Sequence, residues 1–78
     1  MDIENYEIFV NAVQSGSISM AAAENGYTQS AVSYIFKALE KKCGFKLVHR
    51  SRDGISLTKF GEMLLPKISA VIDADKEL

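Results

Sequence analysis

The segment from residue 28 to residue 44 carries the side chains whose types and spacing could do chemistry. Placed on a helix, it puts hydroxyl groups, one phenol and two cations along one side: Ser30, Ser33, Tyr34, Lys37 and Lys41. This stripe contains no acidic residue, whereas a solvated helix face usually mixes Glu with Lys. Short donors and acceptors near a helix N-terminus, followed by lysines, suit a helix that enters a DNA major groove. The alternative is an ordinary amphipathic helix with a polar outer face.

The other side of the same helix is apolar and is expected to face a core. It consists of Val32, Ile35, Phe36, Leu39 and Cys43. Cys43 is the only cysteine, which excludes an intramolecular disulfide and agrees with a reducing cytoplasm. Its position in the apolar stripe predicts a small core residue rather than a nucleophile.

Two further helices must position this segment. Helices are expected over residues 3–15, 18–25 and 28–43. Ser17 or Ser19 can cap the second helix, and Thr28 is a good N-cap for the third. Two helices joined by a turn of a few residues, the second bearing the polar stripe, form a helix-turn-helix pattern.

A β-hairpin is expected after the third helix, where the hydrophobic period changes to two. The alternating runs are residues 45–50 and 55–57. Asp53-Gly54 between them predicts a type I′ turn, in which both central residues have positive φ. Such a hairpin would be a wing spanning residues 47–57, with Arg50 and Arg52 at its tip, long enough to reach phosphates or a minor groove.

A final helix is expected from Lys59 to near Leu78, capped by Thr58. Pro66 inside it predicts one bent helix, the alternative being two shorter helices that meet at Leu65. Its apolar stripe is wider than one face, which predicts a twofold dimer. The residues assigned to that dimer surface are Met63, Leu64, Ile68, Val71 and Ile72. The chain is therefore divided into a DNA-binding domain, 1–58, and a linker and dimerisation helix, 59–78.

Charge is distributed very unevenly along a chain of 78 residues whose net charge is only −1. Residues 1–27 contain four acids and no Lys or Arg, and residues 60–78 contain two bases against four acids. Residues 28–59 contain seven bases against two acids. A local cationic block of this kind matters more for phosphate contact than the charge of the whole chain.

The sequence offers little for other function classes. His49 is the only histidine, so neither a metal site nor a Ser-His-Asp arrangement is expected, and His49 is assigned to an exposed place in the hairpin. There is no glycine-rich phosphate loop, and neither enzymatic activity nor a cofactor is expected. The acidic N-terminus and the absence of a long apolar run predict a cytoplasmic protein without a membrane partner.

The chain resembles the N-terminal DNA-binding domain of a LysR-type transcriptional regulator, a bacterial family. The matching residues are Phe9 and Val13, Gly16 to Ser19, Ala21 and Ala22, Thr28 to Ser33, Leu39 and Glu40, Gly44, Leu47, Arg50, Gly54, Leu57 and Thr58, and Gly61. The resemblance implies a mainly α fold: a winged helix-turn-helix with a three-helix core, a two-stranded β wing and a long C-terminal linker helix. That helix pairs antiparallel with its copy in a homodimer. Members usually continue into a domain that binds a small effector, so an effector partner is expected only if the parent protein has such a domain.

The resemblance also implies contacts to double-stranded DNA, residue by residue. They fall on Thr28, Gln29, Ser30, Ser33, Tyr34 and Lys37 of the recognition helix and on Arg50 and Arg52 of the wing. Gln29 suits bidentate reading of adenine, and Ser33 can donate or accept.

The chain departs from the family pattern at three contact positions. Members commonly have proline at the position of Ser30, and arginine at the positions of Tyr34 and Asp53. Asn25 and Tyr27 also replace apolar residues. The acidic ends of the chain and the missing arginine at Tyr34 leave room for one rival function, a winged-helix protein-interaction or dimerisation module without DNA affinity.

Overall fold

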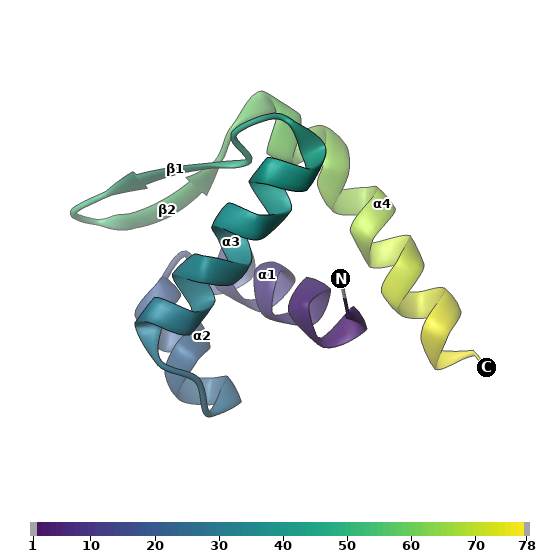
Figure 1. Cartoon of the computed structure of the whole chain (residues 1–78), viewed down its shortest axis with the longest axis horizontal. Helices are drawn as coiled ribbons and strands as arrows, with labels where there is room; N and C mark the ends of the chain where they lie inside the picture. Colours follow the sequence, from purple (N-terminus) through teal and green to yellow (C-terminus); the bar gives the residue numbers. More distant parts are fainter. Residues whose placement is uncertain (1, 78) are drawn as a thin grey trace.

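The computed structural model describes residues 2–77 and contains four helices and one hairpin within them (Figure 1). The elements are α1 (Ile3–Ser15), α2 (Ile18–Asn25), α3 (Gln29–Cys43), β1 (Val48–Ser51), β2 (Gly54–Leu57) and α4 (Lys59–Lys76). The wing and α4 extend to opposite sides of α3. The mainly α, winged helix-turn-helix architecture expected from the sequence is confirmed.

Three hydroxyl side chains cap the N-termini of α2, α3 and α4, as the sequence predicts. The hydroxyl of Ser17, rather than that of Ser19, accepts a hydrogen bond from the backbone N–H of Met20 at 3.1 Å. Thr28 caps α3 and Thr58 caps α4 in the same way. Each bond satisfies one of the N–H groups that a helix start leaves without a partner, so these residues fix where the helices begin.

The core lies where α1, α2 and α3 meet the base of the wing and α4. Its largest fully buried side chains include Phe9 and Phe36, whose ring centroids are 5.1 Å apart. Ala21 and Ala22 are also buried, and their small side chains allow α2 to pack closely on its neighbours. The apolar stripe of α3 is therefore covered, which leaves its polar stripe outside.

Two polar residues near the α2–α3 turn have found hydrogen-bond partners. The amide nitrogen of Asn25 donates to the carbonyl oxygen of Ala21 at 2.7 Å. The hydroxyl of Tyr27 donates to Oε1 of Glu4 at 2.7 Å, and this bond raises the pKa of Tyr27 above its ordinary value. The Asn25 bond lies within α2, and the Tyr27 bond connects the turn to α1.

The hairpin turn differs from the predicted type I′ turn. Ser51 pairs with Gly54, so Arg52 and Asp53 are the central residues of the turn. Within residues 2–77 only glycines have positive φ, which excludes a positive φ at Asp53. Gly54 has φ 131°, and its backbone runs so close to Gly16 that a Cβ atom on Gly54 would collide with the carbonyl oxygen of Gly16. Tertiary packing, not the local dipeptide preference, therefore sets this turn.

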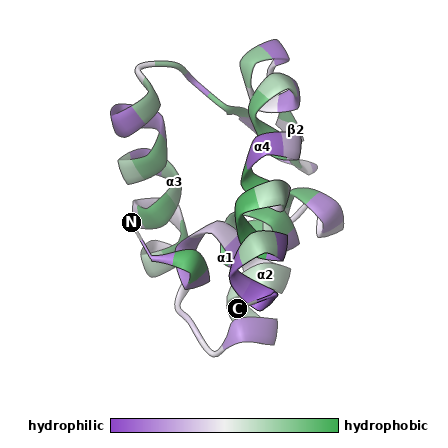
Figure 2. Ribbon diagram, turned by 90° about the vertical axis from the view of Figure 1, so that its right-hand side faces the viewer, coloured by the Kyte–Doolittle hydropathy of each residue, from purple (hydrophilic) through white to green (hydrophobic). Residues whose placement is uncertain are grey.

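Helix α4 is one continuous helix with Pro66 inside it, so the alternative of two shorter helices is wrong. Hydrophobic residues occupy its middle and hydrophilic residues its C-terminal end (Figure 2). Ile68 and Ile72 are only 5% and 7% exposed and belong to the domain core. The helix ends at Lys76, close to the expected end near Leu78, and residue 78 itself lies outside the described residues.

Candidate nucleic-acid interface

The outer side of α3 presents a continuous polar surface, here called the recognition face. It consists of Gln29, Ser30, Ser33, Tyr34 and Lys37, which line one open depression. Ser33 is half-buried and the other four are exposed, with Tyr34 at 73%. The structure therefore brings together the recognition-helix residues that the sequence grouped.

Thr28 lies just before the recognition face, and its hydroxyl serves the helix itself. The oxygen accepts a hydrogen bond from the backbone N–H of Ala31 at 3.1 Å. This cap holds the first turn of α3, whose free N–H groups carry partial positive charge. Thr28 is exposed, so its role at the interface is to fix the helix end next to Gln29.

Glu40 is the only acid in α3, and its carboxylate is directed away from the recognition face. Oε2 accepts hydrogen bonds from the backbone N–H groups of Leu47 at 2.6 Å and Val48 at 3.3 Å. These bonds hold the base of the wing against α3. Glu40 is among the residues that resemble the family pattern, but the sequence alone assigned it no function. The signal that could have found one is a lone acid near the end of a helix otherwise free of acids.

The other edge of the wing is attached to the turn between α1 and α2. The backbone N–H of Ile55 donates to the carbonyl oxygen of Gly16 at 2.9 Å. Together with the Glu40 bonds, this contact fixes the hairpin at both strands. The wing is therefore placed relative to α3 before any ligand binds.

Arg50 does not lie at the tip of the wing, which corrects the sequence prediction. It sits inside β1 opposite Ile55, and its Nη1 donates to Oγ of Ser33 at 3.3 Å. Its guanidinium carbon lies 5.8 Å from the ring centroid of Phe36. A planar cation can both donate to the hydroxyl and stack near the ring, so Arg50 joins the wing to the recognition helix.

Arg52 occupies the tip as predicted and is exposed beside Asp53. A second depression connects this side of the wing with the starts of α2 and α3. It is lined by Ser17, Ile18, Ser19, Gln29, Arg50, Ser51, Arg52, Gly54 and Ile55. Gln29 lines both depressions and so lies where the recognition face meets the wing. Ser17 and Ser19 were predicted only as helix caps, and their place beside this surface is visible only in the structure.

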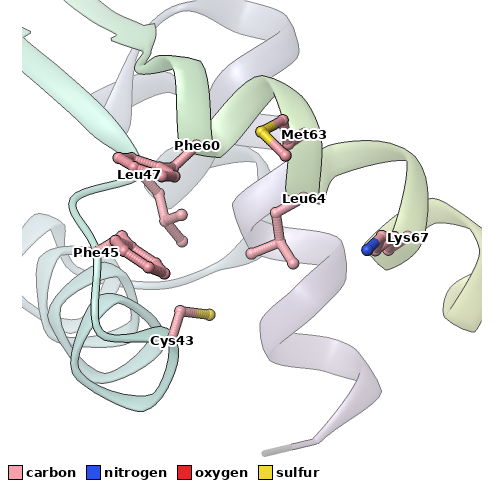
Figure 3. A pocket seen from close by; sticks show the side chains of 7 residues that line it. All are labelled: Cys43, Phe45, Leu47, Phe60, Met63, Leu64 and Lys67. Carbon is pink, nitrogen blue, oxygen red and sulfur yellow. The ribbon is translucent and has the colours of Figure 1, made fainter.

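A different surface, here called the α4 face, is formed by Phe60, Met63 and Val71. Met63 is 64% exposed, and Phe60 and Val71 are each 48% exposed. The ring of Phe60 stacks on that of Phe45 with centroids 4.2 Å apart. Figure 3 shows the groove of about 320 Å³ that these rings share with Cys43, Leu47, Met63, Leu64 and Lys67.

The α4 face corrects part of the predicted dimer surface. Ile68 and Ile72 were assigned to that surface, but both are buried in the core of the domain itself. Met63 and Val71 are exposed, and Leu64 is half-buried between the two environments. The apolar stripe of α4 is wide because one side of it packs in the core of the domain and the other side is left uncovered.

Other kinds of site have no support in the part of the chain that the structure describes. His49 is exposed in β1, as expected. Residues 2–77 contain no group of three His, Cys, Asp or Glu side chains that could hold a metal ion. No helix among these residues has the length and apolar character to cross a membrane.

Comparison with known proteins gives a consistent family assignment. Residues 3–62 match the family model of the bacterial regulatory helix-turn-helix proteins of the lysR family. The transcriptional regulator TdcA of Escherichia coli K12 is 41% identical over 64 residues, which cover 82% of this chain and 20% of TdcA. The regulator MetR of Buchnera aphidicola is 44% identical over 70 residues, covering 81% of this chain and 22% of MetR. The chain thus spans about a fifth of the length of these relatives.

Solved structures agree with the sequence comparison. The DNA-binding domain of CbnR in complex with DNA has a TM-score of 0.93 and 25% identity, covering 99% of this chain and 88% of the other. VV2_1132, a LysR family transcriptional regulator, has a TM-score of 0.90 and 30% identity, covering 97% of this chain and 26% of the other.

Proposed function

The chain belongs to the LysR family of bacterial regulatory helix-turn-helix proteins, and we propose that it is the DNA-binding domain of a transcriptional regulator. In this proposal α3 enters a major groove of double-stranded DNA and the wing lies against the backbone or an adjacent minor groove. The observation that carries it is the recognition face: largely exposed, free of acids and bordered at Gln29 by the depression that Arg52 also lines. The likeness to a domain solved with DNA supports it.

The side chains of the recognition face divide into base readers and phosphate contacts. Gln29, near the start of α3, can pair with adenine through its amide in a bidentate manner. Lys37, two turns later, can neutralise a phosphate. Tyr34 can stack or donate a hydrogen bond but carries no charge, so it replaces the arginine common in the family without replacing its phosphate contact.

The wing contributes a single free cation at its tip. Arg52 is exposed there, whereas the neighbouring Asp53 has the opposite charge. We assign Arg52 to the sugar-phosphate backbone or the minor groove, because its side chain is long and carries several donors. Asp53 limits how close the turn can approach phosphates.

We further propose that two copies pair through α4, with Met63, Leu64 and Val71 in contact. These side chains are apolar and lie on the uncovered side of α4, next to the groove of Figure 3. A twofold dimer would present two α3 helices to successive major grooves, so the preferred DNA would be an inverted repeat. Sedimentation at increasing concentration should show a dimer, and a monomer throughout would contradict this part.

The experiment that tests DNA binding is a titration with fluorescent duplexes at several salt concentrations. Random-sequence duplexes measure the non-specific affinity, and a pool selected by the protein supplies the specific site. The logarithm of the affinity should fall with the logarithm of salt by about 0.9 per phosphate contacted. Negligible affinity even at low salt would contradict the proposal and favour the protein-interaction module.

The remaining parts of the proposal concern the parent protein. The relatives TdcA and MetR are much longer than this chain. A small-molecule effector belongs to the proposal only if the parent protein carries a further C-terminal domain. Binding to a bacterial chromosome would place the regulator in the cytoplasm.

A further inference from the structure

The contact between Arg50 and Ser33 fixes the hydrogen-bonding direction at the centre of the recognition face. Nη1 of Arg50 lies 3.3 Å from Oγ of Ser33, and the guanidinium carbon lies 5.8 Å from the Phe36 ring centroid. A guanidinium can only donate hydrogen bonds, so the Ser33 oxygen is the acceptor in this contact. Among residues 2–77 this is the one hydrogen bond of the Ser33 hydroxyl.

The proton of Ser33 is consequently free for a ligand. A hydroxyl has one O–H donor and two acceptor lone pairs, and Arg50 occupies one lone pair. Donation from a cation polarises the hydroxyl, which makes its O–H a better donor and its oxygen a poorer acceptor. Ser33 is half-buried on the recognition face, so its O–H is available to a partner that approaches this face.

We propose that Arg50 is a positioning residue that sets Ser33 as a hydrogen-bond donor toward DNA. This inference rests on the proposed DNA-binding function and narrows it. The partner of Ser33 is then an acceptor: a phosphate oxygen or one of the acceptors that guanine, adenine and thymine present in the major groove. Cytosine presents only an amino donor there, so at a C·G pair the acceptor for Ser33 is on the guanine.

Arg50 and Arg52 are both arginines of the wing, but they have different roles in this proposal. Arg52 is at the tip and is assigned to the DNA backbone directly. Arg50 is directed to α3 and acts through Ser33. The same substitution at the two positions should therefore have different consequences.

The test measures DNA affinity and its salt dependence for S33A, R50M, the double variant, and R52M as the matched control. Methionine keeps an unbranched stem over Phe36 while removing the charge and the donors. S33A and R50M should each lose about fivefold to tenfold in affinity, the effect of one hydrogen bond. The double variant should lose no more than the worse single variant, and R50M should change the salt slope by less than half a unit. R52M should lower the slope by about 0.9.

Sequence selection from a randomised duplex pool distinguishes the two sources of the acceptor. If S33A relaxes the preference at one base pair, the acceptor is on a base; if it weakens all sequences equally, the acceptor is a phosphate oxygen. A full unit of salt slope lost in R50M, with and without S33A, would overturn the inference, because Arg50 would then contact phosphate itself.

A measurement without DNA keeps the inference testable if R50M fails to fold. Nitrogen relaxation of the Arg50 Nε–H group should report an ordered side chain in the native protein and a mobile one in S33A. Equal order in both would overturn the link between the two residues. Failure of the native protein to bind any duplex would instead refute the proposed function.

Discussion

The recognition face and the α4 face are both exposed, but their side chains suit different kinds of partner. The recognition face is polar, and hydrogen bonds hold it and the wing beside it in place. Glu40 binds the base of the wing, and Arg50 donates to Ser33. The α4 face is apolar, and Met63 is 64% exposed. DNA presents phosphates and base edges at regular spacing, so a surface that binds it benefits from side chains already held in place. An apolar face gains its free energy only when a second surface covers it.

The distribution of charged residues explains how a chain with a net charge of −1 can present a surface suited to DNA. The seven basic residues of residues 28–59 lie in α3, in the wing and in the segments next to them, whereas most acidic residues lie in the flanking thirds of the chain. The single acid of α3 is occupied by backbone N–H groups of the wing. The electrostatic potential that a phosphate encounters at this surface is therefore set by the local arrangement of charges rather than by the net charge of the chain.

The largest expected effect separates the two sides of α4. Ile68→Asp places a charge in the core and should lower the free energy of unfolding by about 4 kcal/mol or more, enough to unfold a small domain. Val71→Asp lies on the α4 face and should change that free energy by less than about 1 kcal/mol while weakening the dimer. Urea unfolding and sedimentation measure both quantities. If Val71→Asp unfolds the chain as Ile68→Asp does, the division of α4 into two sides is wrong.

The next largest effect is at the junction of the wing with α4. A Cβ atom on Gly61 would collide with the carbonyl oxygen of Leu47 and lie 2.8 Å from Cδ2 of Leu57. Gly61→Ala should therefore destabilise the domain by about 3 kcal/mol through overpacking. Gly44→Ala is the control, because nothing lies within 4 Å of its Cβ and only the positive φ of 81° opposes it. That control should cost about 1 kcal/mol, and equal costs would show that backbone crowding is not the cause.

A moderate effect is expected from releasing the wing. Glu40→Ala leaves the N–H groups of Leu47 and Val48 without their carboxylate acceptor, which should cost about 2 kcal/mol. Hydrogen exchange should show lost protection at these two amides. Glu24→Ala removes an exposed acid and should stay within about 0.5 kcal/mol. Unchanged protection in Glu40→Ala would mean that the strand pairing alone holds the wing.

The smallest effects leave folding untouched and act only on DNA binding. Gln29→Ala should cost on the order of 1–3 kcal/mol at one preferred base pair and almost nothing elsewhere. Lys37→Ala should weaken all sequences alike and lower the salt slope by about 0.9. Binding of matched and mismatched duplexes at several salt concentrations separates the two. If Gln29→Ala leaves the sequence preference unchanged, the assignment of Gln29 as a base reader is wrong.

The sequence predicted the elements well because their signals are local. Helical spacing, hydroxyl caps and the change of period after Gly44 each depend on residues a few positions apart. The recognition face followed from the same spacing, because one covered side of α3 determines the other.

Contacts between distant residues could not be predicted in this way. Asp53-Gly54 favours a type I′ turn locally, yet the approach of Gly54 to Gly16 moved the turn to Arg52 and Asp53. The path of Arg50 toward Ser33 depends on how the wing leans on α3, which the alternation of a strand does not contain.

The amino-acid sequence by itself thus determined which residues are helical, where the hairpin lies and which side of α3 is polar. Only the tertiary structure decided that Ile68 and Ile72 belong to the core while Met63 and Val71 stay uncovered. The physical reason is that a broadly apolar helix carries no local mark of which side will be packed. That choice is made by the neighbours that pack against it, here α1 and strand β2 of the wing.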